Sequence, residues 1–230
     1  MKAYEVVLAH IEQQILSGQL VVGSVLTPER DLALQLGVSR TAVREALRTL
    51  QAQGLITAQV GTGPTSGTRI AGEHSPALGK LLQMHVALAQ FPIDDVVEAR
   101  VMLERWNVEL AAANASSDEL AELGGLLDSM EDPQLPLDEF NQLDTTYHVG
   151  IAELGGNQLV IVLTTAVRRA LAVPIREASL KLPDHGAFRG DLVRQHRLIF
   201  EAITDREPAH AADLIEEHIR HAYSILPISH

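Results

Sequence analysis

Cysteine is absent from this chain of 230 residues, and only 3% of its residues are aromatic. Disulfides and thiolate metal sites are therefore excluded. The N-terminus lacks the basic-then-apolar pattern of a secretion signal, and no apolar run approaches the roughly 18 residues of a membrane span. With Ala, Leu and Val dominating the composition, these absences predict a mainly helical, cytoplasmic protein that does not contact a membrane.

The formal net charge of -12 argues against nucleic-acid binding until it is divided along the chain. Residues 1–72 contain six Lys/Arg and five Asp/Glu, about +1, whereas the remainder contains 12 and 25, or -13. Because phosphate repels an acidic body, only the N-terminal part is suited to face DNA. We expect a DNA-binding domain over residues 1–72, a linker at 73–76 and a helical domain over 77–230.

Apolar periodicity in the first 72 residues predicts three short helices, over residues 4–17, 28–36 and 40–53. Each ends at a glycine, which is typical of a helix C-terminus. Two β-prone segments follow, over residues 55–60 and 68–70, separated by a turn rich in Gly and Thr. Three helices followed by a small hairpin predict a winged helix-turn-helix.

The remainder of the chain is predicted to form an all-α antiparallel bundle of about seven helices. The expected helices are near 77–90, 93–114, 117–131, 137–154, 157–180, 189–205 and 208–226. Pro174 lies inside the fifth of them and is expected to kink or split it, because proline removes a backbone donor and clashes with the preceding turn.

The helix expected over residues 40–53 has the features of an element that lies in a DNA major groove. It follows a turn at Gly37, opens with Ser39 as a capping hydroxyl, and carries Arg40, Arg44 and Arg48 at helical spacing. The alternative interpretation is that these arginines form a solvated face paired with neighbouring carboxylates.

The same segment resembles the GntR family of winged-helix bacterial transcription regulators. The resemblance is carried by Glu29-Arg30-Asp31-Leu32-Ala33, Gly37-Val38-Ser39-Arg40, Val43-Arg44-Glu45-Ala46-Leu47 and Gly54-Leu55. It implies that Arg30, Arg40 and Arg44 make the main DNA contacts, that Ser39 and Thr41 contact phosphate or bases, and that Gly61 approaches the minor groove. Since helix-turn-helix proteins read two half-sites, a homodimer on a pseudo-palindromic double-stranded operator is expected.

A second group of residues has the character of metal ligands. Asp144 and His148 are separated by four positions and project from one helix face, while His196 and His218 each lie on a later helix. A bundle can bring three such helices around one polar centre. One carboxylate and three imidazoles suit Zn²⁺ or another divalent first-row ion. Spacing alone leaves open that these are surface groups or satisfied core residues.

The C-terminal part resembles the ligand-binding FCD domain of the FadR-type branch of the same family. The resembling residues are Glu98-Ala99-Arg100, Glu104, Asp144 to His148, Gly156-Asn157, Arg194-Gln195-His196 and Glu217-His218-Ile219. The resemblance implies that Asp144, His148, His196 and His218 hold a divalent metal, with zinc the first expectation and nickel or manganese the alternatives. It also implies a small carboxylate effector, an organic or sugar acid.

Arginine is the residue expected to receive the free end of that acid, because guanidinium binds carboxylate through two hydrogen bonds. Arg100 is the first candidate. Of the adjacent pair Arg168 and Arg169, we prefer Arg169, because Thr165 one turn earlier extends a polar stripe.

The function predicted first is a ligand-responsive DNA-binding regulator, a repressor released by an acid bound at the metal. The alternative is a metal-dependent hydrolase with an accessory DNA-binding domain, which requires a general base beside a metal-bound water. No H-E-x-x-H, G-x-S-x-G or phosphate-loop motif supports it. A DNA-bridging protein in which the metal serves stability alone is a third interpretation.

Overall fold

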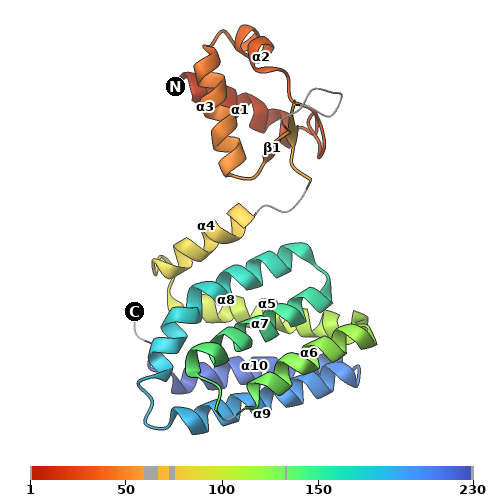
Figure 1. Cartoon of the computed structure of the whole chain (residues 1–230), viewed down its shortest axis with the longest axis vertical. Coiled ribbons are helices and arrows are strands. Elements are labelled where there is room, and N and C mark those ends of the chain that lie inside the picture. Colours follow the sequence, from red (N-terminus) through yellow and green to blue (C-terminus); the bar gives the residue numbers. More distant parts are fainter. Residues whose placement is uncertain (1, 60–66, 73–75, 133, 229–230) are drawn as a thin grey trace. The chain divides into compact units, whose positions relative to one another are not determined.

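The computed structural model describes residues 2–59, 67–72, 76–132 and 134–228. The chain divides into two compact units, Met1–Leu78 and Gly79–His230 (Figure 1). Each unit has a hydrophobic core of its own. The predicted fold class is confirmed: a helix-turn-helix with a small hairpin is followed by an all-helical bundle.

The first unit consists of α1 (Ala3–Leu16), α2 (Glu29–Leu36), α3 (Arg40–Ala52) and the strands β1 (Ile56–Gln59) and β2 (Gly67–Ile70). The two strands form an antiparallel hairpin. Helix α3 packs on α1, α2 and β1. The three helices and the hairpin therefore surround one small core.

The turn between α2 and α3 is built as the sequence predicts. Gly37 has a left-handed backbone with φ of 65°, a conformation that glycine adopts without steric cost. The Oγ of Ser39 then accepts a hydrogen bond of 3.1 Å from the backbone N–H of Ala42, which caps α3. Val43 and Leu50 are fully buried on the inner face of α3. The cap and the apolar face together fix which side of α3 faces solvent.

The hairpin is anchored at its base by Ile56 and Ile70, which pair across the two strands and are both buried. The predicted wing turn lies mostly at residues 60–66, outside the described residues. Gly61, predicted to approach the minor groove, is one of these residues.

The second unit is the bundle, and Figure 1 shows its helices gathered around α5. The helices are α4 (Pro76–Ala87, whose first residues belong to the first unit), α5 (Ile93–Asn114), α6 (Ser117–Met130), α7 (Leu137–Gly155), α8 (Gln158–Ser179), α9 (His185–Thr204) and α10 (Pro208–Ile225). Helix α5 packs on α7, α8, α9 and α10. A polar residue on the inner face of α5 therefore meets residues from several helices at once.

The start of α9 and the continuity of α8 differ from expectation. Helix α9 begins at His185, because the Oδ1 of Asp184 accepts a hydrogen bond of 2.8 Å from the backbone N–H of Ala187 and caps it four residues earlier than predicted. Helix α8 continues through Pro174 and is not split. Buried Leu171 and Ala178 hold the helix on either side of the proline.

Helix α8 is unusually apolar. Within the described residues it is the one helix long and apolar enough to cross a membrane by length and composition, with a mean hydropathy of 1.5. The expectation that no segment reaches this length and hydropathy was therefore wrong. The core helix of a soluble protein passes the same test, and α8 carries the buried, ion-paired Arg168. Only 33% of the 18-residue apolar window in α8 is buried inside the structure.

Candidate metal centre and DNA-facing helix

The structure brings together the four residues that the sequence singles out as metal ligands. Asp144 and His148 lie one turn apart on α7, His196 lies on α9 and His218 on α10. Their candidate ligand atoms all lie within 4.8 Å of one another, and the three imidazoles are buried. Since these groups come from three helices, the fold itself creates the cluster.

The spacing of the ligand atoms suits a single ion. The Nε2 atoms of His148 and His196 are 3.1 Å apart, and those of His196 and His218 are 3.2 Å apart. The Oδ1 of Asp144 lies 3.4 Å from the Nε2 of His196. Two nitrogens held about 2.05 Å from one Zn²⁺ lie about 3.1–3.4 Å apart at angles of about 100–110°. The donor set therefore fits one metal ion.

Polar contacts on the outer side of two imidazoles also favour a metal ion in the cluster. The Nδ1 of His148 lies 2.6 Å from the Oε2 of Glu104, and the Nδ1 of His218 lies 2.9 Å from the Oε1 of Gln195. Both outer partners are acceptors, so each Nδ1 carries the ring proton and each Nε2 presents a lone pair inward. Both lone pairs lie about 3 Å from the Nε2 of His196, so one cation among the three nitrogens can accept all of their lone pairs.

Burial favours the neutral, metal-binding form of the histidines. It lowers the pKa of His196 to about 3 and holds the pKa of His218 well below its ordinary value. The pKa of His148 is lowered by burial and by the Arg168 guanidinium. Burial acts to raise the pKa of Asp144, but Arg168 and the neighbouring histidines outweigh it and lower that pKa. At neutral pH the cluster therefore offers one carboxylate and three neutral imidazoles.

A buried ionic network supports the cluster. The Oε1 of Glu104 accepts from the Nε of Arg100 at 2.7 Å and from the Nε of Arg168 at 2.8 Å. Arg168 also donates from Nη2 to the Oε2 of Glu104 at 2.7 Å and from Nη1 to the Oδ2 of Asp144 at 3.0 Å. Arg168 thus ties one candidate ligand, Asp144, to the carboxylate that contacts another candidate ligand, His148.

The sequence interpretation missed this network. The structure places Arg168 in the core, whereas the preferred Arg169 is exposed and lines a separate surface hollow with Asp138 and Arg176. Successive helical residues point about 100° apart, so only one of two adjacent arginines faces inward. The sequence spacing does indicate which arginine is buried, because Thr164, Arg168 and Leu171 recur at helical intervals and are all buried.

Arg100, the first candidate for binding the acid, lies beside the cluster. It lines a small cavity of about 30 Å³ together with Asp144, His218 and Tyr223, and its Nη1 donates to the Tyr223 hydroxyl at 3.3 Å. This volume is close to that of one water molecule. An acid of several heavy atoms enters only if the surrounding helices move.

The residues predicted to contact DNA lie on the solvent-facing side of α2 and α3. Arg30, Ser39, Arg40, Thr41 and Arg44 are all exposed. The Nε of Arg44 donates to the Oε2 of Glu29 at 2.8 Å, and the Nη2 of Arg40 lies 4.0 Å from the same oxygen. The expected pairing with a carboxylate is therefore present at Glu29. Because exposed ion pairs are weak, phosphate can displace Glu29 from these arginines.

Comparisons with known proteins match both parts of the chain. The model of the FCD domain matches residues 95–221, and that of the bacterial regulatory proteins of the gntR family matches residues 3–65. The Glc operon transcriptional activator of Escherichia coli (strain K12) is 27% identical over 223 residues, covering 94% of this chain and 85% of the relative. The HTH-type transcriptional repressor NanR of Klebsiella aerogenes is 28% identical over 233 residues, covering 95% and 83%.

Among solved structures, Streptococcus agalactiae GntR matches with a TM-score of 0.56 and 24% identity, covering 97% of this chain and 100% of that one, and so shows the shared fold. The relatives are transcription regulators rather than enzymes, so the hydrolase alternative is not supported. The chain belongs to the GntR family of DNA-binding transcription regulators, in the FadR-type branch that joins a GntR helix-turn-helix to an FCD domain, and its FCD domain carries a candidate His/Asp metal site.

Proposed function

We propose that this regulator is a cytoplasmic repressor whose affinity for its operator is controlled by a small organic or sugar acid bound at a zinc centre. The observation that carries the proposal is the buried set of three imidazoles and one carboxylate, with two imidazole lone pairs fixed inward beside Arg100. A metal centre beside a buried arginine is suited to bind an acid, which supports a role in the response to an effector.

Zinc is the ion that the donor set favours, with nickel and manganese as alternatives. Three nitrogens and one oxygen match common zinc environments. The nitrogen separations of 3.1 and 3.2 Å correspond to angles of about 100°, smaller than the tetrahedral value. Compressed angles leave room for a fifth or sixth ligand, which an acid supplies through its own oxygens.

Arg100 is the residue that we assign to the acid's free carboxylate oxygen. It lines the same cavity as the ligands Asp144 and His218. Because that cavity has a volume of only about 30 Å³, the acid selects a more open arrangement of the helices around it. A change in helix arrangement is the kind of event that couples effector binding to operator affinity. Release of the operator is the direction we propose.

The operator is read by the exposed face of α3, inserted in the major groove. The exposed Arg40 and Arg44 contact guanine edges or phosphate in this arrangement. Arg30, Ser39 and Thr41 make further contacts at the edge of the same surface. Gly61 remains a proposed minor-groove neighbour. Two copies of this unit reading a pseudo-palindromic duplex require a homodimer.

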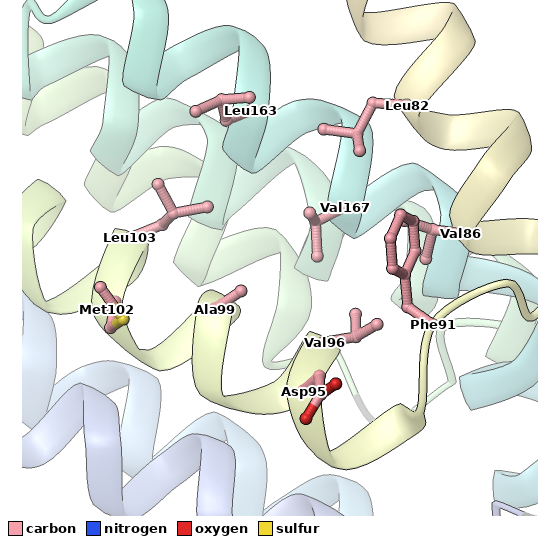
Figure 2. Close-up of a pocket in the computed structure, with 10 residues that line it drawn as sticks. All are labelled: Leu82, Val86, Phe91, Asp95, Val96, Ala99, Met102, Leu103, Leu163 and Val167. Carbon is pink, nitrogen blue, oxygen red and sulfur yellow. The ribbon is translucent and has the colours of Figure 1, made fainter.

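An uncovered apolar face on the second unit supports the homodimer. A hollow of about 380 Å³ is lined by residues of α4, α5, α8 and the loop before α5. Figure 2 shows that these side chains are apolar except for Asp95. Helix α4 has no buried residue. Leu81 and Met84 of α4, Leu88 directly after it, and Met102 and Trp106 of α5 are exposed large apolar side chains. A short helix with an uncovered apolar face is marginal in water, so a second copy is the occupant we propose.

The test uses the full-length protein and a duplex carrying its own upstream DNA. We expect zinc-loaded protein to bind this duplex in fluorescence anisotropy and to release it as one member of an organic-acid panel is added. The His196→Ala variant is expected to bind the same duplex without responding to the acid. Operator affinity that no acid changes in the zinc-loaded protein contradicts the proposal.

A further inference from the structure

Asn141 is a polar residue in an otherwise apolar part of the cavity wall beside the metal cluster. It lies on α7, three residues before Asp144, and therefore on the same face of the helix. It lines the cavity that Arg100 and His218 also line. Its neighbours in that wall include Leu137, Phe140 and Ile175, and the half-buried Asn141 also borders the surface hollow that Arg169 and Arg176 line.

The Asn141 amide has unused hydrogen-bonding capacity. Its Nδ2 is buried, and within the part of the chain that the structure describes it has no hydrogen-bond partner. A buried donor without an acceptor costs free energy, because it loses its hydrogen bonds to water and gains none in return. A bound ligand can supply the acceptor that this donor lacks.

Three other polar residues of the cavity wall already make hydrogen bonds. The Oγ of Ser179 donates to the backbone carbonyl of Ile175 at 2.9 Å, and the Tyr223 hydroxyl accepts from Arg100 at 3.3 Å. The Nη1 of Arg189 donates to the backbone carbonyl of Leu135 at 2.7 Å. Asn141 thus stands apart as a buried donor in this wall whose hydrogen bonds remain to be made.

We propose that Asn141 binds a second oxygen-bearing group of the effector, a hydroxyl or a second carboxylate, and so selects hydroxy or dicarboxylic acids over plain alkyl acids. This inference rests on the proposed function, in which the metal and Arg100 take the first carboxylate. Residues three apart on a helix have Cβ atoms about 5–6 Å apart. An acid of about three or four carbons therefore reaches from the metal held by Asp144 to the Asn141 amide.

The test measures acid binding to zinc-loaded, full-length protein by isothermal titration calorimetry with two matched pairs, lactate with propionate and succinate with butanoate. We expect the wild type to bind the oxygen-bearing member of at least one pair at least tenfold more tightly. In Asn141→Leu we expect this preference to fall below threefold, through weaker binding of the oxygen-bearing acid. Asn141→Asp is expected to weaken succinate binding further, because like charges repel.

Two controls separate this proposal from loss of folding or of metal. Gln142→Leu changes an exposed neighbour that does not line this cavity, and it is expected to leave both preferences unchanged. Asn141→Leu is expected to keep its zinc affinity and to raise the melting temperature of the acid-free protein, because an unpaired buried donor is removed.

The outcomes distinguish the two proposals. If wild type and Asn141→Leu bind the acids with the same preference, or if Asn141→Leu melts at a lower temperature than wild type, the role of Asn141 is overturned and the acid-responsive zinc centre stands. If zinc-loaded wild type binds no carboxylic acid at all, the proposed function fails and the role of Asn141 fails with it.

Discussion

Replacement of Glu104 by Gln tests the buried ionic network directly. Glu104 is 2% exposed and its carboxylate contacts Arg100, Arg168 and His148. Glutamine has nearly the same volume, so packing is preserved while the negative charge is lost. Two buried guanidinium groups are then left without the carboxylate that they share. Removing one partner of a buried ion pair costs about 3–5 kcal/mol, and we expect the unfolding free energy of the metal-free protein to fall by about that amount.

The same substitution is expected to weaken metal binding. The Glu104 carboxylate holds the proton of His148 on Nδ1, whereas a glutamine amide can present a donor at the same place. Loss of such an outer partner typically lowers metal affinity about 10–100-fold. Chemical denaturation in the presence of a chelator measures the first effect, and competition with a chromophoric chelator measures the second.

Glu98→Gln is the matched control. Glu98 lies on the same helix and also accepts two hydrogen bonds from an arginine, Arg220, at 2.7 and 3.1 Å, but this pair is exposed to solvent. We expect no resolvable change in unfolding or in metal affinity for this variant. A loss below about 1 kcal/mol in Glu104→Gln, the range of surface pairs, would refute the view that the network is a stabilising buried unit.

Three further predictions concern pH, DNA and assembly. Burial lowers the folded-state pKa of His196 from 6.5 to about 3, so the unfolded chain takes up the proton first as pH falls. Between pH 7.5 and about pH 5.5, the unfolding free energy of the chelator-treated protein should therefore fall by about 1.4 kcal/mol because of this histidine. An unfolding free energy that stays constant over this range would contradict the prediction. In anisotropy titrations, Arg40→Ala should weaken operator binding and reduce the dependence of the affinity on salt concentration. Arg169→Ala, which also removes an exposed arginine, should change neither. Leu81→Asp should shift the mass measured by light scattering towards the monomer, whereas Leu34→Asp, at an exposed leucine of α2, should not.

Most helix boundaries could be predicted because local chemistry fixes them. Gly37 ends α2 with a left-handed backbone, and Ser39 caps α3 through a short-range hydrogen bond. These interactions span a few residues and are visible in the sequence. The start of α9 was missed because Asp184 follows a proline in a segment that was interpreted as a break, although its side chain caps the helix.

The metal ligands could be predicted in part, and of their supporting network the sequence carried a signal only for the inward position of Arg168. Asp144 and His148 share a helix face by spacing alone, but the approach of His196 and His218 depends on how the helices pack. The choice between Arg168 and Arg169 depends on the rotational phase of α8 against α5. That phase is set by the burial of Leu171 and Thr164 against residues that are distant in the sequence.

The charges in the core indicate an order of binding. With neutral histidines, the two guanidiniums of Arg100 and Arg168 balance the two carboxylates of Glu104 and Asp144. In the absence of a metal, an acid would bring an unmatched negative charge into this buried site and would compete with Glu104 for Arg100. A divalent cation instead leaves an excess of two positive charges, and an unpaired buried charge is unfavourable. We therefore infer that the metal binds first and that its positive charge then favours the binding of an anion, most strongly of a dianion. Chelated protein that binds the same acids as zinc-loaded protein in calorimetry would contradict this order.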